Sequence, residues 1–264
     1  MRKERATVIS QAQIAPDIYD MWLQTELAGE AAAGQFVGVY PNDASALLPR
    51  PISICEVNEK KDALRLVYRV AGKGTKEFSG LQAEDQIALL GVLGNGFPVA
   101  AAKDRKVALM GGGIGIPPLL QLAAEMKRAG LAREIHIIAG YRDKELFLQE
   151  DLERYGMLHI ATEDGSVGTR GTVLQVLEQE ECFGHNRPDL IMACGPMPML
   201  RAVKQYAIKQ EIPAYISLEE RMACGVGACL GCVCRTTTRN HHSQVNNARI
   251  CTDGPVFEAR EVDI

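Results

Sequence analysis

The sequence lacks a surplus of basic side chains, and this excludes a large class of functions. Its 264 residues include 29 Lys and Arg against 33 Asp and Glu, for a formal net charge of −4 at pH 7. Proteins that bind nucleic acid or anionic lipid concentrate positive charge against the phosphates. We therefore expect neither nucleic acid nor a membrane among the partners of this chain.

Long apolar segments are also scarce. The N-terminus carries the charges typical of a signal peptide, but residues 8–20 include Gln and Asp where an apolar segment would be required. One uncharged run of 18 residues, 107–124, contains four glycines and two prolines, which predict a strand, a loop and a helix rather than a membrane span. We expect a cytoplasmic protein.

The eight cysteines do not follow the pattern of a disulfide-stapled module. Four of them, Cys224, Cys229, Cys232 and Cys234, fall within eleven positions near the C-terminus, which suits a metal site better than a disulfide framework. The length predicts about two domains, at roughly 150 residues each. An apolar content of 47% and a charged content of 23% are those of a folded globular protein.

Hydrophobic patterning divides the chain into three regions. Residues 1–100 contain six short β-rich segments with one helical turn at 74–79, and they predict a small antiparallel barrel or sandwich. Residues 101–212 alternate strands with amphipathic helices, which is typical of a doubly wound parallel sheet. Residues 213–264 are rich in Gly, Cys, Asn and Thr, and we expect a metal to staple them.

The elements expected in the sheet region follow from the apolar runs and their flanking turns. Strands are expected at 106–110, 134–140, 157–163, 189–195 and 214–219, and helices at 117–130, 144–156, 171–180 and 198–210.

The cysteine spacing near the C-terminus indicates an iron–sulfur centre. Cys224, Cys229 and Cys232 have the spacing C-x4-C-x2-C, with Cys251 further along the chain, and this plant-type arrangement holds a 2Fe-2S cluster. The glycines between them can adopt positive φ angles and let backbone N–H groups face the sulfurs.

Two alternatives stay open for this centre. A zinc site with four cysteine ligands would make the chain a non-redox binding module, although zinc usually takes two C-x-x-C pairs. Cys234 is an alternative fourth ligand. In an extended segment, however, its side chain lies on the same side as that of Cys232, which favours Cys251.

A glycine-rich loop follows the strand expected at 106–110. Its glycines precede a helix that begins with two prolines, where free N–H groups can hold a pyrophosphate. The loop departs from the dinucleotide-binding fingerprint, because Pro118 stands where Gly or Ala should end it. A tight turn that brings helix and sheet together is the alternative interpretation.

Later loops support a nucleotide site at the same edge of the sheet. Residues 162–166 and the loop of Cys194 and Gly195 also follow strands, so three loops converge at the carboxyl ends. Cys194 is either a small buried side chain or a neighbour of a nicotinamide. No acidic residue ends the second strand cleanly, since Arg142 precedes Asp143. The choice between NAD and NADP stays open.

Three features of the first region together favour a flavin between the barrel and the sheet. Arg50 precedes Pro51, which holds it extended, so that its guanidinium can bind a phosphate with two hydrogen bonds. Arg69 follows an aromatic residue, and Gly74 and Thr75 open a short helix with free N–H groups. Taken singly, each arginine fits a surface charge on a strand.

The order of these motifs resembles one superfamily. A barrel with RPIS at 50–53, a sheet with GGGIG and ACGP, and a terminal CGVGACLGC with CTDGPVF are similar to the ferredoxin-NADP reductases. Over nearly the whole chain, the closer resemblance is to the electron-transfer subunits of bacterial NAD-dependent dihydroorotate dehydrogenases. It implies a multi-domain β plus α/β fold: an antiparallel β-barrel flavin domain (1–100), a doubly wound parallel-sheet nucleotide domain (101–212) and a small iron–sulfur domain (213–264).

The resemblance and the motifs together imply three sets of cofactor contacts. The expected FAD contacts are Arg50, Pro51, Ile52, Ser53, Val67, Tyr68, Arg69, Gly74 and Thr75. The expected NAD contacts are Gly111, Gly112, Gly113, Gly115, Cys194 and Gly195, and the expected 2Fe-2S ligands are Cys224, Cys229, Cys232 and Cys251.

The resemblance also implies an activity in pyrimidine biosynthesis. An FMN-containing partner oxidises dihydroorotate, and electrons pass through the cluster to FAD and leave as hydride to NAD, within a heterotetramer of two copies of each subunit. We find no acid–base pair for dihydroorotate oxidation in this chain, so we expect no catalytic residue here. The loop of 18 residues before Cys251, which includes His241 and His242, is longer than this resemblance leads us to expect.

One related function is the main alternative. A flavin and iron–sulfur subunit of a ferredoxin-dependent NADP reductase or sulfide dehydrogenase resembles this chain closely. In that group we expect Asp as the first cluster ligand, whereas this chain has Cys224.

Overall fold

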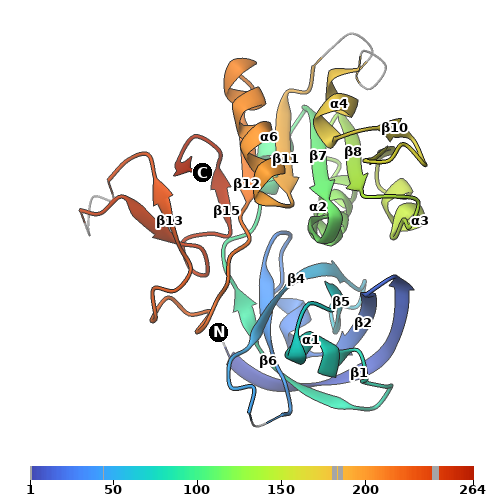
Figure 1. Ribbon diagram of the computed structural model, residues 1–264, viewed down its shortest axis with the longest axis vertical. Helices are drawn as coiled ribbons and strands as arrows, with labels where there is room; N and C mark the ends of the chain where they lie inside the picture. Colours follow the sequence, from blue (N-terminus) through green and yellow to red (C-terminus); the bar gives the residue numbers. More distant parts are fainter. Residues whose placement is uncertain (1, 44, 180–182, 184–186, 240–243) are drawn as a thin grey trace.

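The computed structural model of the chain describes residues 2–43, 45–179, 183, 187–239 and 244–264. It has three parts: a β-barrel, a mainly parallel sheet covered by helices on both faces, and a C-terminal part beside their junction (Figure 1). The multi-domain β plus α/β fold is therefore confirmed. Within the described ranges, every helix is too short or too polar to cross a lipid bilayer.

The barrel forms because its strands alternate apolar and polar side chains, so that one face of each strand is buried. In β6 every second residue is buried, and Leu66 and Leu89 are among the fully buried side chains of the interior. The strands pair in the closed order β1-β2-β5-β4-β3-β6. Their bounds are β1 (Arg2–Ala15), β2 (Ile18–Gln24), β3 (Phe36–Tyr40), β4 (Arg50–Val57), β5 (Ala63–Arg69) and β6 (Gln86–Leu93), with helix α1 (Lys73–Phe78) after β5.

The second part is a seven-stranded sheet in the order β10-β9-β8-β7-β11-β12-β15. Its strands are β7 (Lys106–Gly112), β8 (Glu134–Tyr141), β9 (Met157–Thr162), β10 (Thr169–Arg170), β11 (Leu190–Cys194), β12 (Ala214–Ser217) and β15 (Val256–Glu258). Helices α2 (Pro117–Arg128) and α3 (Gln149–Glu153) pack on one face, and α4 (Val173–Glu178) and α6 (Met197–Lys209) on the other. This is the expected doubly wound arrangement. Short 3-10 turns are η1 (Glu26–Gly29), η2 (Val99–Ala102) and η3 (Gly113–Gly115).

One expected helix is much shorter than its apolar pattern suggested. Residues 144–156 were expected to be helical, but α3 covers only Gln149–Glu153. Before it, the Glu145 N–H donates to the Asp143 carboxylate, 2.9 Å away, and Phe147 packs edge-on against Tyr141. The apolar side chains of this stretch are buried although much of it is a loop. Their spacing therefore resembled that of an amphipathic helix.

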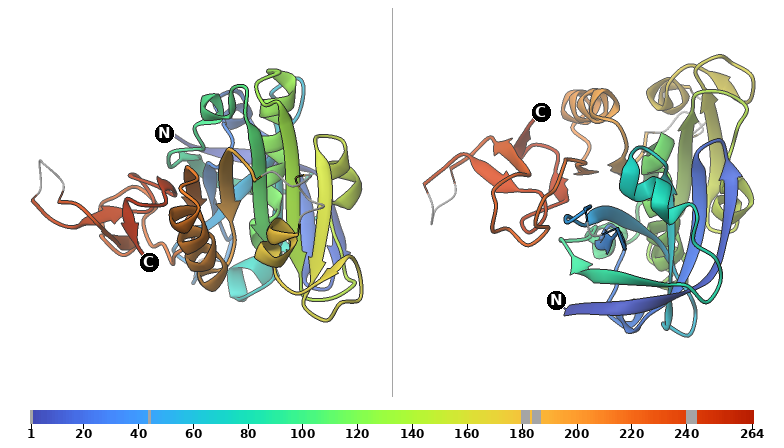
Figure 2. Two further views of the ribbon diagram at one scale, coloured as in Figure 1. Left: turned by 90° about the horizontal axis from the view of Figure 1, so that it is seen from above. Right: turned by 60° about the horizontal axis from the view of Figure 1, so that its bottom comes forward.

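The C-terminal part builds a small sheet and also joins both neighbours. Strands β13 (Val233–Thr236), β14 (Asn247–Arg249) and β16 (Val262–Asp263) form the small sheet, and β15 extends the large sheet in antiparallel direction. The side chain of Asn95, just after the barrel, donates to the carbonyls of Thr252 and Asp253 at 3.0 and 3.1 Å. Figure 2 shows this part projecting to the side of α6.

Candidate functional site

The four expected cluster cysteines lie in one loop and one neighbouring turn. The loop that follows β12 carries three of them, and Cys251 lies in the turn between β14 and β15. The N–H groups of Val226 and Cys229 each lie 3.4 Å from the Cys224 sulfur, and the Gly227 N–H lies 3.2 Å from the Cys251 sulfur. Backbone donors therefore face the sulfurs, an arrangement that stabilises thiolates and tunes bound iron.

Left-handed backbone at Gly225 and Gly227, with φ of +70° and +79°, lets this loop wrap around the sulfurs. The Val226 N–H is the largest cause that lowers the pKa of Cys224 to about 6, whereas burial raises the pKa of Cys251 to about 11. Cys251 is 1% exposed. The centre therefore has one side open to solvent and one side buried.

The sulfurs approach each other in two pairs. The side chain of Cys229 lies within hydrogen-bond reach of the Cys224 sulfur, and that of Cys232 within reach of the Cys251 sulfur. In the described ranges, no three His, Cys, Asp or Glu side chains surround a single ion position. Two pairs are what a two-iron cluster needs, because each iron takes two cysteine ligands.

Cys234 is placed differently from these four cysteines. It lies in β13 opposite Ala248 and packs half-buried against the core of the large sheet. Because the Gly227 N–H points to the Cys251 sulfur, the contacts favour Cys251 over Cys234 as fourth ligand. His241 and His242 lie outside the described residues.

Two of the expected flavin motifs meet at the start of α1. A Cβ atom added to Gly74 would lie 2.4 Å from Nε of Arg50, so the guanidinium rests directly on the first turn of the helix. Arg50 also donates to the Leu48 carbonyl. The Thr75 hydroxyl accepts the N–H groups of Ala71 and Gly72 at 2.9 and 3.1 Å, so its side chain is occupied in capping the helix.

The remaining flavin residues lie on the adjacent strands β4 and β5. Pro51, Ile52 and Ser53 are half-buried on β4. The Tyr68 side chain points into the barrel, where it stacks on Tyr19 and its hydroxyl donates to Gln11 at 2.8 Å.

Burial raises the pKa of Tyr68. Val67 is buried against the nucleotide part, and Arg69 is exposed. Because the Tyr68 side chain is buried in the barrel, only the backbone of Tyr68 is left to contact a ligand.

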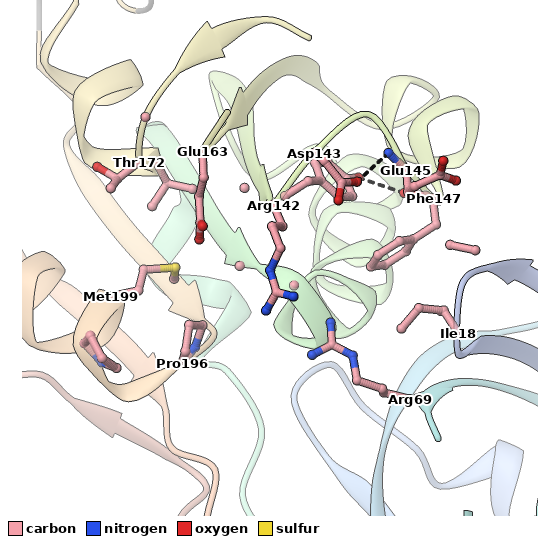
Figure 3. Close-up of a pocket in the computed structure, with 18 of the residues that line it drawn as sticks. Ile18, Arg69, Arg142, Asp143, Glu145, Phe147, Glu163, Thr172, Pro196 and Met199 are labelled. Atoms are coloured by element: carbon pink, nitrogen blue, oxygen red, sulfur yellow. Dashed lines mark hydrogen bonds between the residues drawn. The ribbon is translucent and has the colours of Figure 1, made fainter. Parts of the chain in front are cut away.

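A cavity of about 820 Å³ opens at the carboxyl ends of β7, β8, β9 and β11. Gly112 and Gly113 line it, and Gly113 has φ of +53° with the Arg69 guanidinium 3.5 Å from where its Cβ would be. The other lining residues include Ala15, Pro16, Asp17, Ile18, Arg142, Asp143, Glu145, Glu163, Thr172, Pro196 and Met199 (Figure 3).

The other expected nucleotide residues lie in closely packed surroundings. A Cβ on Gly115 would lie 2.4 Å from the Cys194 carbonyl oxygen, and one on Gly111 would lie 2.7 Å from Leu119. A Cβ on Gly195 would meet Met199 at 2.9 Å. Burial raises the pKa of Cys194 to about 12. For Gly111 and Gly115, these contacts favour the tight turn that brings helix and sheet together, and a ligand contact through their backbone stays a prediction.

The barrel's contribution to this cavity was not expected from the sequence. Residues 15–18 form the turn between β1 and β2, which lies far from the glycine loop in sequence and has no motif of its own. Glu163 belongs to a loop that the sequence did place at this edge, although no role was assigned to its side chain. Only the docking of the barrel against the sheet brings these groups together.

Comparisons with known proteins point in one direction. A family model described as the iron-sulfur cluster binding domain of dihydroorotate dehydrogenase B matches residues 219–263, and a model described as an oxidoreductase NAD-binding domain matches residues 109–205. A curated relative from Listeria welshimeri, 41% identical over 100% of both chains, is the electron transfer subunit of dihydroorotate dehydrogenase B (NAD(+)). The protein of that name from Bacillus velezensis is 40% identical over 99% of both chains.

Solved structures agree on the fold. An NADH-dependent reduced ferredoxin-NADP oxidoreductase, studied for flavin-based electron bifurcation, is 27% identical with a TM-score of 0.84, over 98% of this chain and 89% of the other. A Neisseria gonorrhoeae ferredoxin NADP+ reductase with bound FAD and NADP is 17% identical, with a TM-score of 0.69 over 84% of this chain and 94% of the other. The second likeness shows the fold alone.

Proposed function

The chain belongs to the family of electron-transfer subunits of NAD-dependent dihydroorotate dehydrogenase B, and from this membership we propose which of its residues carry the electrons' route. It is an NAD-linked flavin and iron–sulfur oxidoreductase subunit that works with a catalytic partner subunit. Electrons from dihydroorotate pass through its 2Fe-2S cluster and FAD to NAD. The observation that carries the proposal is the arrangement of four cysteines in two pairs beside the barrel.

Cys224, Cys229, Cys232 and Cys251 are the proposed ligands of the cluster. The support is the donor set itself: four thiols in two pairs, with backbone N–H groups directed at three of the sulfurs. The proposed iron–sulfur domain is 213–264. Anchored to the barrel through Asn95, it lies against the flavin domain, which suits electron transfer between them.

FAD is the proposed ligand of the barrel domain, residues 1–100. Arg50 and the N–H groups of Gly74 and Thr75 would hold its pyrophosphate, since a guanidinium and free backbone donors both bind phosphate. Pro51, Ile52 and Ser53, with the backbone of 67–69, would line the ring side. When bound, FAD exchanges single electrons with the cluster and a hydride with nicotinamide.

NAD is the proposed ligand of the cavity in the nucleotide domain, residues 101–212. Gly112 and Gly113 let a pyrophosphate approach the backbone, and Arg69 supplies charge from the barrel side. The conformation of this loop depends on close packing at Gly111, Gly115, Cys194 and Gly195. The barrel and sheet together enclose the cavity, so hydride exchange between NADH and FAD needs no other chain.

The partner is proposed to contain FMN and to form a heterotetramer of two copies of each subunit. Dihydroorotate oxidation requires a base and a hydride acceptor next to the substrate. The residues assigned above are all committed to FAD, NAD or the cluster. The ferredoxin-linked alternative has weaker support, because Cys224 stands where Asp is expected in that group and the relative of that type is 27% identical.

A reconstitution experiment tests the function. Purified alone, the chain should oxidise NADH with an artificial electron acceptor and leave dihydroorotate unchanged. With the catalytic subunit added, dihydroorotate should reduce NAD. Turnover of dihydroorotate by the lone chain would contradict the division of labour, and much faster oxidation of NADPH than of NADH would favour the ferredoxin-linked alternative.

A further inference from the structure

The barrel and the nucleotide domain meet across an apolar interface that polar contacts also cross. Ile18, Cys55 and Val67 of the barrel belong to one buried cluster with Leu119 and Leu120 of α2. Apolar contacts have no preferred direction, so on their own they allow one domain to rotate on the other. Hydrogen bonds and ion pairs depend on distance and angle, and they fix an orientation.

The first set of polar contacts joins α2 to the barrel. The side-chain oxygen of Gln121, a residue 3% exposed, accepts the Val57 N–H at 2.8 Å. The Gln121 amide donates to Glu125 at 2.8 Å, and Glu125 accepts the Ala33 N–H at 2.9 Å. β4 pairs with β3 only as far as Ser53, and beyond that point α2 supplies the partner of the Val57 N–H. A shift of α2 along the barrel would break these bonds.

The second set of polar contacts joins α3 to the barrel. Nη2 of Arg65 lies 2.9 Å from the Asp151 carboxylate, and the same guanidinium binds Asp20 at 2.8 Å and Glu56 at 3.1 Å. The side chains of Arg65 and Asp151 are 11% and 19% exposed. Asp20 and Glu56 belong to the barrel, whereas Asp151 belongs to the nucleotide domain. The ion pair of Arg65 with Asp151 therefore crosses the interface, shielded from most of the solvent.

Both sets of contacts lie next to the proposed cofactor sites. α2 lies between β7 and β4 and begins directly after the glycine turn whose Gly113 lines the cavity (Figure 1). α3 follows the loop from which Arg142 and Phe147 line the same cavity. On the barrel side, β4 carries the proposed FAD contacts at 50–53. The contacts thus connect the flavin strand to two walls of the nucleotide cavity.

We propose that Gln121 and Asp151 are positioning residues for hydride exchange, which hold the nucleotide domain on the barrel in the orientation that this step requires. Neither residue lines the cavity. Hydride exchange needs the reacting atoms about 3–3.5 Å apart, and a displacement of about 1 Å can cost roughly a hundredfold in rate. Dinucleotide binding relies mainly on the nucleotide domain itself and tolerates such a displacement. This assignment rests on the proposed FAD and NAD sites.

The kinetic test separates orientation from binding. In stopped-flow reduction of FAD by NADH, the rate at saturating NADH should fall about tenfold in Gln121→Met and in Asp151→Ala, while the dissociation constant of NADH changes by less than about threefold. Asp151→Asn keeps an oxygen acceptor for Arg65 and should lose less. If Asp151→Ala does not fold, Asp151→Asn carries the same comparison.

Matched controls remove polar contacts that do not reach the barrel. Gln149 donates to Glu153 within α3, and Arg154 pairs with Asp151 at the end of the same helix. Gln149→Met and Arg154→Ala should therefore leave both the rate of FAD reduction and the dissociation constant of NADH unchanged.

Amide hydrogen exchange gives a measurement that is independent of hydride transfer. The Ala33 N–H donates to Glu125 of α2, so it belongs to the set of contacts that does not contain Asp151. If the two sets together orient one domain, exchange at Ala33 should quicken in Asp151→Ala. A purely local role of Asp151 would leave Ala33 at the wild-type rate.

Three results would overturn the positioning role. These are an unchanged rate of FAD reduction in both variants, an equal loss of rate and of NADH affinity, and unchanged exchange at Ala33 in Asp151→Ala. A wild-type chain that binds NADH and FAD but transfers no hydride between them would instead contradict the proposed function.

Discussion

The β-barrel and the C-terminal region are held together in different ways. The barrel closes on itself, and its interior, including Leu23, Leu64 and Leu66, forms a separate apolar core. The buried side chains of the C-terminal region, such as Ile250 and Phe257, instead belong to the core of the neighbouring sheet. One region is stabilised by its own hydrophobic interior, and the other depends on its neighbours and on metal ligation.

Loss of a cluster ligand should break the C-terminal region most severely. We expect Cys224→Ser, Cys229→Ser or Cys232→Ser to remove iron and to disorder the loop of residues 219–231, because nearly all of this loop is exposed or half-buried and metal ligation rather than an apolar core orders it. Iron and sulfide assays with amide hydrogen exchange measure this. The barrel amides should stay protected.

The fourth ligand is tested in the same assays. Cys251→Ala should lose the cluster and Cys234→Ala, the matched control, should keep it. Full iron occupancy in Cys251→Ala would reassign the ligand.

A cavity in the barrel should destabilise the protein without removing a cofactor ligand. Leu66 is fully buried, so Leu66→Ala should lower the free energy of unfolding of the barrel by about 2–5 kcal/mol. Urea denaturation followed through barrel signals measures the loss. Ile9→Ala, at a side chain 47% exposed, is the control and should have little effect. A lower iron content in folded Leu66→Ala than in the wild type would show that the two regions are not independent.

Removal of the Arg50 guanidinium should weaken the binding of FAD and leave the iron–sulfur cluster in place. Arg50→Ala should weaken FAD binding by about 1.5–3 kcal/mol, or roughly ten- to hundredfold, while iron content stays constant. Flavin content after dialysis is the measurement, and Arg5→Ala, at an exposed barrel arginine, is the control. Undiminished FAD would return Arg50 to the role of a surface charge.

The smallest expected effect concerns the junction of the two regions. Asn95→Ala removes two hydrogen bonds to the turn after Cys251 and should cost about 1 kcal/mol. Hydrogen exchange of residues 252–255 should quicken. Asn58→Ala, which removes similar bonds within a barrel hairpin, should leave that exchange unchanged. Equal exchange rates in the two variants would mean that Asn95 does not couple the regions.

The local sequence pattern predicted strands and helices correctly where burial of one face is enough to fix the element. The six barrel strands and the alternating sheet and helices follow from apolar period and turn residues, because burial of one face fixes them. It failed at 144–156, where a loop buries Phe147 and Leu148. The pattern also could not show which glycines at 111–115 contact a ligand and which contact a neighbouring helix. That depends on the segments that pack against the loop.

The sequence alone determined the order of the three regions and the C-x4-C-x2-C spacing of the cysteines, because metal-ligand spacing and hydrophobic period are properties of neighbouring residues. Tertiary structure decided the rest. It turned the Tyr68 side chain into the barrel, placed Arg50 on Gly74, and brought Arg69 and Glu163 into one cavity. Those contacts join residues far apart in the chain, and only the packing of barrel against sheet brings them within reach of one ligand.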